Sequence, residues 1–585
     1  MGYWLIDSYG KQSRASFYKI VKGLLLLSLI CLFPQTLFSQ NDGRLHILNS
    51  DILYRNYIDP HADVLVGNVK LSRDGAYLDC DSAKYYKEEG SFDAFGNVKY
   101  HQGDTLSMVC DTLLYDGISR QMKARGSVVL KRRQSKLVTE KLDYDRVYGV
   151  GMYMDGGTLY DGDNVLVSDW GQYTEETQLA FFTSNVKLTN NGTDVLSDSL
   201  EYNTRTKDAF FTGNVKLKNE DYDIVSTAMY YNTDTEKARI IAPTNITTSD
   251  GMFIYSTNGD YDMKEDNADL LTGSYIIKDM RKIEGDSLHY DKASGINEAF
   301  GNVIVTDEEN QCMLLGDYCW YDENTGNALA TDSAVVIDYS SPDTMYVHAD
   351  TLKMFTYNIE TDSVYRDLYA FHHVRMFRSD VQAVCDSMVT HELDSCTYLY
   401  GQPILWNENE QVFGEEIRVY NNDSTISWIR VINQAMTVER LDSISYNQVS
   451  AKEIRTYFNG KEIDRNEAHG NVLVCYYFSE DDGTPVGMNY SESTDLTLFL
   501  KDKKVSKIWM PAANGNMYPP DKIPSDKRFL KNFAWFDYIR PIDKYDIFNW
   551  RSKEAKDILS QTSEKQVPLQ SLSDIKEKAK NQQTK

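Results

Sequence analysis

A tyrosine that returns every 29 to 31 residues constrains this chain more than any other feature. Nine tyrosines keep that spacing: Tyr85, Tyr115, Tyr144, Tyr173, Tyr202, Tyr231, Tyr261, Tyr290 and Tyr321. A unit that recurs at a fixed period is the signature of a repeat protein, in which each unit packs on its neighbours. We therefore expect one elongated body built from repeats, although 585 residues could hold several domains.

Three further rows of residues keep step with the tyrosines. The position five residues before each tyrosine holds only Cys, Thr, Ser or Gly, which indicates that another group approaches closely, and the next position is mostly acidic. Positions seven and five before the tyrosine share one side of a strand, but position two and the tyrosine have the opposite parity, so a bulge or corner is predicted between them. The position seven before always holds a large aliphatic residue, and this ladder row is Leu78, Met108, Leu137, Leu166, Val195, Ile224, Ile254, Ile283 and Leu314.

Each unit closes with Gly-Asn-Val or a variant of it, as at Gly213-Asn214-Val215 and Gly301-Asn302-Val303. Gly and Asn tolerate positive φ, so this motif before an alternating apolar run predicts a turn that leads into a strand. Each unit is then two strands and two turns. The fold class that follows is all-β: an elongated, repeat-built open sheet of about 26 antiparallel strands, on the order of 120 Å long. A right-handed parallel β-helix, also built from apolar ladders, stays open as an alternative.

The first 39 residues have the layout of a signal peptide. A positively charged start precedes the apolar run 23–33, and Ser39 offers a cleavage point, so we expect an exported protein. Lipidation at Cys31 is a less favoured alternative, because the preceding Ser28-Leu29-Ile30 lacks the small residue expected beside a lipidated cysteine. Later runs are not apolar enough for a membrane helix, so the mature chain is expected to be peripheral to membranes.

Beyond residue 39 we expect three regions: a repeat domain over 45–500, an aromatic C-terminal cap over 501–550 and a polar tail over 551–585. In the cap, Ser525 is placed to begin a short helix, and such a segment would cover the open end of the sheet. That helix would carry, on one side, Phe529, Phe533 and Phe536.

Seven cysteines follow the signal peptide, which leaves at least one of them free. Cys80 and Cys110 occupy the small-residue row two strands apart, beyond the reach of a disulfide, and are expected to be small core residues. Cys385 and Cys396 could pair across a hairpin.

The net charge of −26 argues against a nucleic-acid partner, which requires clustered Lys and Arg. The nine histidines show no metal-ligand spacing, and the adjacent His372 and His373 would point to opposite faces of a strand. A Gly-x-Ser-x-Gly elbow, a Cys-x-x-Cys pair and a phosphate-binding glycine loop are all missing from the sequence. The acidic row could serve calcium or a carbohydrase, but a residue repeated in nearly every unit is better explained by the geometry of every unit. We predict no catalytic residue, no metal and no cofactor.

The exported start, the repeat ending in Gly-Asn-Val-Lys-Leu and the Asp-Ser-Leu-x-Tyr-Asn element at 198–203 together resemble the OstA-like family over roughly residues 45–480. This is the family of periplasmic lipopolysaccharide-transport proteins that includes LptA and the N-terminal domain of LptD. The resemblance implies an open β-jelly-roll whose apolar groove holds the acyl chains of lipid A. It also implies edge-to-edge stacking with related transport proteins, in the periplasm and in association with the outer membrane. The chain is longer than a lone bridge subunit and lacks the barrel that follows the domain in LptD.

The favoured function is therefore a periplasmic lipid-binding protein of lipopolysaccharide transport and outer-membrane assembly, not an enzyme. The ladder row defined above would line its groove, because an aliphatic ladder needs something apolar against it, either the opposite wall or lipid. Two alternatives stay open: a secreted carbohydrate-active β-solenoid enzyme and a surface adhesion repeat protein.

Overall fold

The computed structural model describes residues 45–553 apart from 56, 105, 360, 423–424, 461, 481–483 and 502–503. The signal peptide expected over 1–39 and most of the polar tail lie outside these residues. The chain divides into two compact units, one up to Gly151 and one from Met152. No helix in the described part is long and apolar enough to cross a bilayer.

The described elements are forty strands and four short 3-10 helices, so the prediction of an all-β fold is confirmed. In the described residues the paired strands run antiparallel, as between β3, β4, β5 and β6, which excludes parallel coils there. The strands of the first unit are β1 (His46–Asn49), β2 (Ile52–Arg55), β3 (Ala62–Arg73), β4 (Ala76–Tyr86), β5 (Ser91–Gln102), β6 (Leu106–Tyr115), β7 (Gln121–Arg132) and β8 (Ser135–Asp145).

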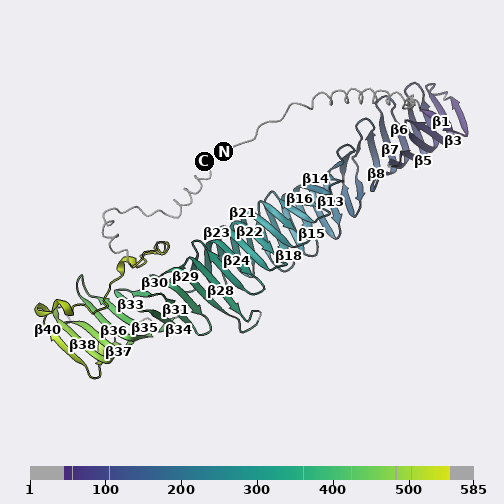
Figure 1. Cartoon of the computed structure of the whole chain (residues 1–585). Helices are drawn as coiled ribbons and strands as arrows, with labels where there is room; N and C mark the ends of the chain where they lie inside the picture. Colours follow the sequence, from purple (N-terminus) through teal and green to yellow (C-terminus); the bar gives the residue numbers. More distant parts are fainter. Residues whose placement is uncertain are drawn as a thin grey trace, which may run out of the picture. The chain divides into compact units, whose positions relative to one another are not determined.

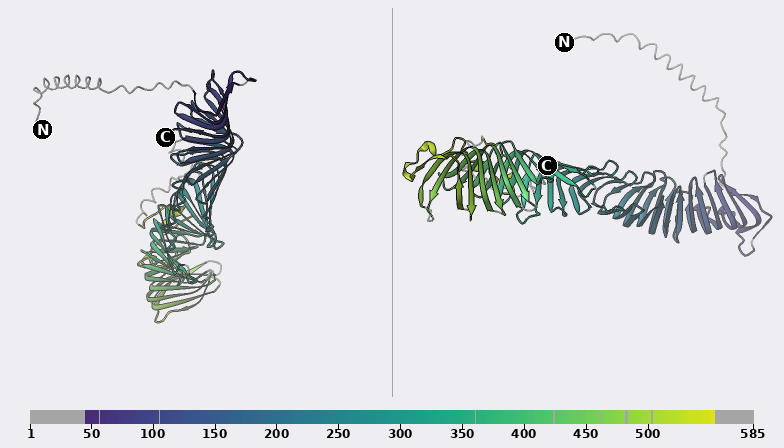
Figure 2. Two further views of the ribbon diagram at one scale, coloured as in Figure 1. Left: turned by 90° about the vertical axis from the view of Figure 1, so that its right-hand side faces the viewer. Right: turned by 90° about the horizontal axis from the view of Figure 1, so that it is seen from below.

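The division between the units falls within β9 (Val150–Tyr153). In the second unit the sheet advances along the chain (Figures 1 and 2). Its strands are β10 (Gly157–Asp161), β11 (Asn164–Ser168), β12 (Trp170–Thr174), β13 (Leu179–Asn190), β14 (Thr193–Asn203), β15 (Asp208–Lys218), β16 (Tyr222–Asn232), β17 (Lys237–Ile240), β18 (Thr244–Thr248), β19 (Phe253–Ser256), β20 (Gly259–Asp262), β21 (Asn267–Lys278), β22 (Arg281–Asp291), β23 (Ile296–Asp307), β24 (Cys312–Asp322), β25 (Asn327–Thr331), β26 (Val335–Asp338), β27 (Met345–His348), β28 (Thr351–Tyr357), β29 (Tyr365–Phe377), β30 (Val381–His391), β31 (Cys396–Tyr400), β32 (Ile404–Asn407), β33 (Glu410–Phe413), β34 (Glu416–Asn422), β35 (Thr425–Arg440), β36 (Tyr446–Asn459), β37 (Glu462–Ser479), β38 (Pro485–Lys501), β39 (Lys504–Trp509) and β40 (Asn514–Tyr518). Where a strand is divided in two, its halves pair separately, as β17 with β20 and β18 with β19.

Each long strand crosses a corner and contributes to two facing walls. In β14 the pairing with β15 shifts register between Leu196 and Ser199, opposite the Gly213-Asn214 corner of β15. The half that holds the ladder residue belongs to what we name the first wall, and the half that holds the tyrosine belongs to the second wall. Val195 and Tyr202 are both 0% exposed, so the ladder row and the tyrosine row face the same interior. The predicted corner between the two parities is confirmed.

The acidic row holds these corners together. Asn214 has a φ of 48° and donates its side-chain N–H to Asp198 Oδ2 at 2.9 Å. A Cβ on Gly213, whose φ is +75°, would lie 2.3 Å from the same carboxylate oxygen, so the corner requires glycine for two reasons. The same Asn-to-Asp hydrogen bond recurs at 2.6–2.9 Å in four other corners: Asn68 to Asp51, Asn97 to Asp81, Asn185 to Asp169 and Asn302 to Asp286. The carboxylates of these five corners have a structural role.

The predicted number of strands, about 26, is wrong, because many corners break the strand into two. β17 pairs with the second-wall half of β16 and β18 pairs with its first-wall half. Between them lie residues 241–243, which end in Pro243, and between β31 and β32 lie residues 401–403, which end in Pro403. Proline cannot donate a ladder hydrogen bond, so a corner that contains it separates two short strands instead of bending one long strand.

The seven cysteines that the structure describes are all free. The proposed pair of Cys385 and Cys396 is wrong: Cys385 lies opposite Val374 and Cys396 lies opposite His391, so the two are at different ends of their hairpin. Cys80 and Cys110 lie on β4 and β6 with β5 between them, as predicted. Burial raises the pKa of both thiols to about 11, as expected for small core residues.

The chain after β40, residues 519–553, is named the strap here. Its elements are η1 (Pro520–Lys522), η2 (Ser525–Lys527), η3 (Asp537–Ile539) and η4 (Asp546–Phe548). The helix predicted at Ser525 is wrong, because Ser525 only opens the three-residue η2, and the N-cap position of η2 is held by Pro524. Prolines at 519, 520 and 524 restrict the backbone of this stretch and leave room only for short turns.

From the sequence, this segment was expected to cover the open end of the sheet. Instead, the strap runs back over earlier strands. Gln448 of β36 donates to the Arg528 carbonyl at 2.8 Å and accepts from the Leu530 N–H at 2.9 Å. Gln411 of β33 does the same with Ala534 and Phe536, at 2.9 and 2.7 Å. Both glutamines are buried, and their amides act as surrogate peptide groups that hold the strap on the outer side of the first wall (yellow in Figure 1).

Candidate functional site

The candidate site is the apolar space between the walls, toward which all nine residues of the ladder row point. Six of them are buried at 3% exposure or less, and three are half-buried. The fully buried members are Leu78, Met108, Leu166, Val195, Ile224 and Ile254. The half-buried members are Leu137, Ile283 and Leu314. The row is therefore uniform in sequence and divided in the structure into packed and accessible stretches.

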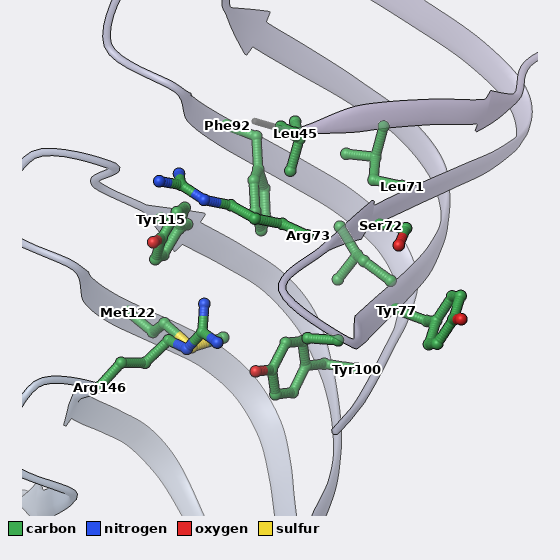
Figure 3. Close-up of a pocket in the computed structure, with 12 residues that line it drawn as sticks. Leu45, Leu71, Ser72, Arg73, Tyr77, Phe92, Tyr100, Tyr115, Met122 and Arg146 are labelled. Atoms are coloured by element: carbon green, nitrogen blue, oxygen red, sulfur yellow. The ribbon is translucent and has the colours of Figure 1, made fainter. Parts of the chain in front are cut away.

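In the first unit the mouth, the line along which the far ends of the two walls meet, is closed by arginines. Arg73 extends from the end of β3 past Phe92 (Figure 3) and donates to the Gly90 carbonyl of the opposite wall at 3.0 Å. The guanidinium groups of Arg73 and Arg146 lie 5.6 and 5.8 Å from the centre of the Tyr115 ring. The cavity beneath them has a volume of about 20 Å³, which is room for little more than a water molecule.

In the second unit the mouth is first closed by a buried polar network, named the latch here. The Tyr202 hydroxyl of the second wall donates to Asp161 of the first wall at 2.8 Å, and Lys207 Nζ contacts the same carboxylate at 2.6 Å. Asn164 donates to the Tyr202 oxygen at 3.0 Å and to Thr233 Oγ1 at 3.1 Å. Burial, and then the charge of Asp161, raises the pKa of Tyr202, so the phenol stays protonated. The latch joins the two walls over a dry apolar core.

Farther along the second unit, toward β21 and β24, other aromatic and charged side chains close the mouth between the two walls. The rings of Tyr222 and Tyr261 meet edge to face at 5.6 Å, and Tyr261 donates to Asp266 at 2.6 Å. Lys278, at the end of β21, lies 3.4 Å from Asp250 of the first wall and 3.5 Å from Glu323 of the second. These contacts seal the stretch that contains Val195, Ile224 and Ile254.

Beyond this closure lies a chamber of about 570 Å³ between β21 and β30. Its lining is mostly apolar and includes two members of the ladder row, Ile283 and Leu314. Two residues before the corner, β15 has Phe211, which is 0% exposed, whereas β23 has Ala299 in the same register. Alanine also stands in this register in the closed first unit, at Ala94 and Ala124, so a small side chain at this one position does not by itself open a space. A smaller cavity of about 130 Å³ follows toward β38 and is lined by residues such as Val449 and Leu498.

The histidine pair lies in a strand, β29, as expected, but at the corner of that strand. His372 and His373 have φ values of 61° and 55° and take the place of Gly-Asn there. His372 Nδ1 lies 3.4 Å from Asp386 and His373 Nδ1 lies 2.8 Å from Asp350, so the rings turn toward different neighbours. In the described residues no three His, Cys, Asp or Glu side chains come together as metal ligands would.

The comparisons with known proteins agree with this architecture. The model of a family described as OstA-like protein matches residues 43–198. Over these residues the chain is similar to OstA-like proteins. The folded-over antiparallel sheet is the β-jelly-roll that this family implies, and the matched residues carry the first five members of the ladder row. A second family model, described as lipopolysaccharide-assembly, LptC-related, matches residues 152–249, which contain the latch.

Among solved structures, a similar one is the crystal structure of LptH from Pseudomonas aeruginosa, described as the LptA-homologous periplasmic component of the lipopolysaccharide transport device. The identity is 16%, the match covers 19% of this chain and 75% of that chain, and the TM-score is 0.16. No curated protein matches the chain. The two family matches support a role of this chain in lipopolysaccharide transport.

Proposed function

We propose that this chain is a periplasmic carrier of lipopolysaccharide that holds acyl chains between its two walls. The observation that carries the proposal is the chamber at Ile283 and Leu314, an apolar space of about 570 Å³. The stretch around Val195, Ile224 and Ile254 is closed, and the cavity toward β38 is much smaller, at about 130 Å³. Such a volume lies within the roughly 300–1,000 Å³ of ordinary ligand sites, so it suits part of a lipid at a time. The rest of the ladder row would contact lipid only where the walls part.

Burial of acyl chains is favourable enough to hold a lipid out of water. Each buried methylene contributes roughly 0.8 kcal/mol, so a chain of about a dozen carbons gains on the order of 10 kcal/mol before the costs of ordering are subtracted. A lipid that enters the chamber exchanges water for Ile283, Leu314 and their apolar neighbours. The polar head stays at the mouth, where the walls end in charged and polar turns.

We also propose that the chain joins other lipopolysaccharide-transport proteins through its sheet edges and bridges toward the outer membrane. In the described residues β1 and β2 pair only with β3, so each has one unpaired side. Leu48, Ile52 and Leu53 on these strands are each 56% exposed. An exposed apolar edge strand is a template for another strand, and edge-to-edge stacking satisfies its free N–H and C=O groups.

Depletion of the protein from cells tests this function. We expect newly made lipopolysaccharide to accumulate at the inner membrane, because a missing carrier interrupts transfer before the outer membrane. The measurement is membrane fractionation with labelled lipopolysaccharide, and re-expression of the full chain should restore transfer. Normal delivery after depletion, or turnover of a polysaccharide by the purified protein, would contradict the proposal.

A further inference from the structure

We propose that the first unit docks on the surface of an anionic bilayer through a lip that joins apolar turn tips to a cluster of basic side chains. The lip is defined as the second-wall turns 116–120 and 146–149 together with the first-wall turn region 131–136. The inference goes beyond the proposed function, because it concerns the outside of the first unit and needs no lipid in the chamber.

The two second-wall turns of the lip are built alike. Asp116 Oδ1 accepts from the backbone N–H groups two and three residues later, at 2.9 and 3.1 Å. Asp145 Oδ1 does the same in the next turn, at 2.8 and 3.1 Å. The Arg146 N–H donates to the Arg120 carbonyl at 3.2 Å, which holds the two turns side by side. The tips of both turns are therefore fixed in neighbouring positions.

The side chains at these two tips are apolar and exposed. Ile118, Val147 and Tyr148 are 77%, 55% and 74% exposed. Four turns of the second unit have the same pair of hydrogen bonds to an Asn or Asp side chain, and their tips are polar or small: Arg205-Thr206, Asp234-Thr235, Lys264-Glu265 and Ala293-Ser294. The turn itself thus does not require an apolar tip.

The first-wall part of the lip is basic. Residues 120–146 contain nine Lys or Arg and three Asp or Glu, in a chain whose net charge is −26. Four of the nine lie in the turn region: Lys131, Arg132, Arg133 and Lys136. Lys131 and Arg133 are exposed, and Lys131 lies directly opposite Lys136 on the neighbouring strand. Like charges in opposite positions destabilise a sheet, so this cluster suits an anionic partner better than it suits the fold.

The basic region and the apolar tips lie along the same mouth. Arg146, at the start of the second apolar turn, reaches across it, and its Nη2 lies 3.5 Å from Gln102 Oε1 of the first wall. Gln102 is opposite Leu106, and Leu106 is opposite Arg132. The lip therefore presents apolar and basic groups together, one kind from each wall.

An anionic bilayer fits both parts of the lip. Aliphatic and tyrosine side chains on convex tips enter the headgroup region, where their apolar surface leaves water and the phenol keeps its hydroxyl hydrated. Basic side chains beside them are attracted to anionic lipid headgroups. A protein partner would need a concave surface matched to each of the projecting tips, whereas a fluid bilayer adapts to them.

The test measures binding of the full chain to vesicles of phosphatidylcholine alone and of phosphatidylcholine mixed with phosphatidylglycerol. The wild type should bind the mixed vesicles at least about tenfold more tightly, because each cation beside an anionic surface contributes about a fivefold gain. Raised salt should reduce this difference.

Two double variants separate the parts of the lip. Ile118→Ser with Tyr148→Ser should weaken binding to the mixed vesicles at least about tenfold, since these apolar contacts with the bilayer are lost. Lys131→Gln with Arg133→Gln should remove most of the preference for the mixed vesicles and leave the weak binding to phosphatidylcholine unchanged. All four side chains are exposed, so thermal unfolding should match that of the wild type.

Each variant has a control at exposed turn tips of the second unit. Ile444→Ser replaces an apolar tip that is 61% exposed in a turn of the same kind, in which Asp442 Oδ1 accepts from the N–H groups two and three residues later. Arg205→Gln with Lys264→Gln removes two exposed charges. Both controls should bind the mixed vesicles as the wild type does.

Equal binding of the two kinds of vesicle, unchanged binding in either lip variant, or an equal loss in the controls would overturn the inference. A lip variant that changes the oligomeric state instead of vesicle binding would also overturn it, because the lip would then join two copies of the chain. Leu314→Asp separates this inference from the proposed function, since it changes the chamber and should leave vesicle binding intact. Loss of vesicle binding in that variant alone would overturn the lip and leave the carrier standing.

Discussion

Replacing Val195 by aspartate should unfold the latched stretch of the second unit, whereas the same change at Leu314 should leave the fold intact and stop lipid binding. Val195 is 0% exposed and lies beneath the latch, so a carboxylate there has no partner and no water. An uncompensated buried charge costs about 3–5 kcal/mol. Leu314 is half-buried and faces the chamber, where a carboxylate keeps its hydration and instead repels the acyl chain.

The pair is matched, because both residues belong to the ladder row and both receive the same side chain. Denaturant unfolding and hydrogen exchange in β14 and β24 give the stability of each stretch, and binding of a fluorescent lipid gives the function. Hydrogen-exchange protection should fall in β14 of the first variant and persist in β24 of the second. Equal destabilisation by the two substitutions would show that the chamber is as dry as the latched core and would contradict the division of the row.

The second large effect concerns the strap. Arg375 of β29 is 0% exposed and donates to the Ile539 carbonyl at 3.0 Å and to Asp546 at 3.1 Å, both in the strap. Asp546→Ala should therefore leave a buried guanidinium group without its carboxylate and cost about 3–5 kcal/mol. Asp537→Ala is the control, because that carboxylate is exposed and 4.0 Å from Arg540, a pair worth about 1 kcal/mol at most.

Cys475 reports whether the strap is released. It lies under the strap in a cluster with Met436, Val438, Met488 and Leu530, and burial raises the pKa of its thiol to about 12. In Asp546→Ala the thiol should react with a maleimide much faster than in the wild type, while Cys110 in the first unit should react at an unchanged rate. Continued protection of Cys475 together with unchanged stability would contradict the role of Arg375 and Asp546 in holding the strap.

The repeat register predicted the local architecture well, because it depends on interactions between adjacent strands. The parity change between the ladder residue and the tyrosine indicated the corner. The prediction that Gly-Asn is a turn before a strand is wrong, because Gly213 and Asn214 lie inside β15, at its corner, where Asn214 donates to Asp198. The number of strands was wrong for an equally local reason. At two corners, Pro243 and Pro403 turn a bent strand into two, and their positions were visible in the sequence. Other corners, such as 257–258 and 332–334, divide a strand without a proline.

The division of the ladder row could not be predicted from the row itself. Val195 and Leu314 occupy equivalent positions, and what separates them is the size of the side chains on the opposite wall and the polar groups at the mouth. The change from Phe211 to Ala299 in the same register could not have located the chamber, because Ala94 and Ala124 occupy that register in the closed first unit. The latch and the strap depend on contacts between distant residues, such as Gln448 with Leu530, for which a single sequence gives no pattern.

Photocrosslinking in living cells tests the central claim most directly, which is that lipid occupies the chamber and not the latched core. A photoreactive amino acid replaces Leu314, Ile283, Val195 or the exposed Val109 in separate variants of the full chain. We predict adducts with lipopolysaccharide at Leu314 and Ile283, few or none at Val195 in the folded protein, and none at Val109. Adducts at Val109 equal to those at Leu314, or a folded protein that gives no adduct at either chamber position, would contradict the account.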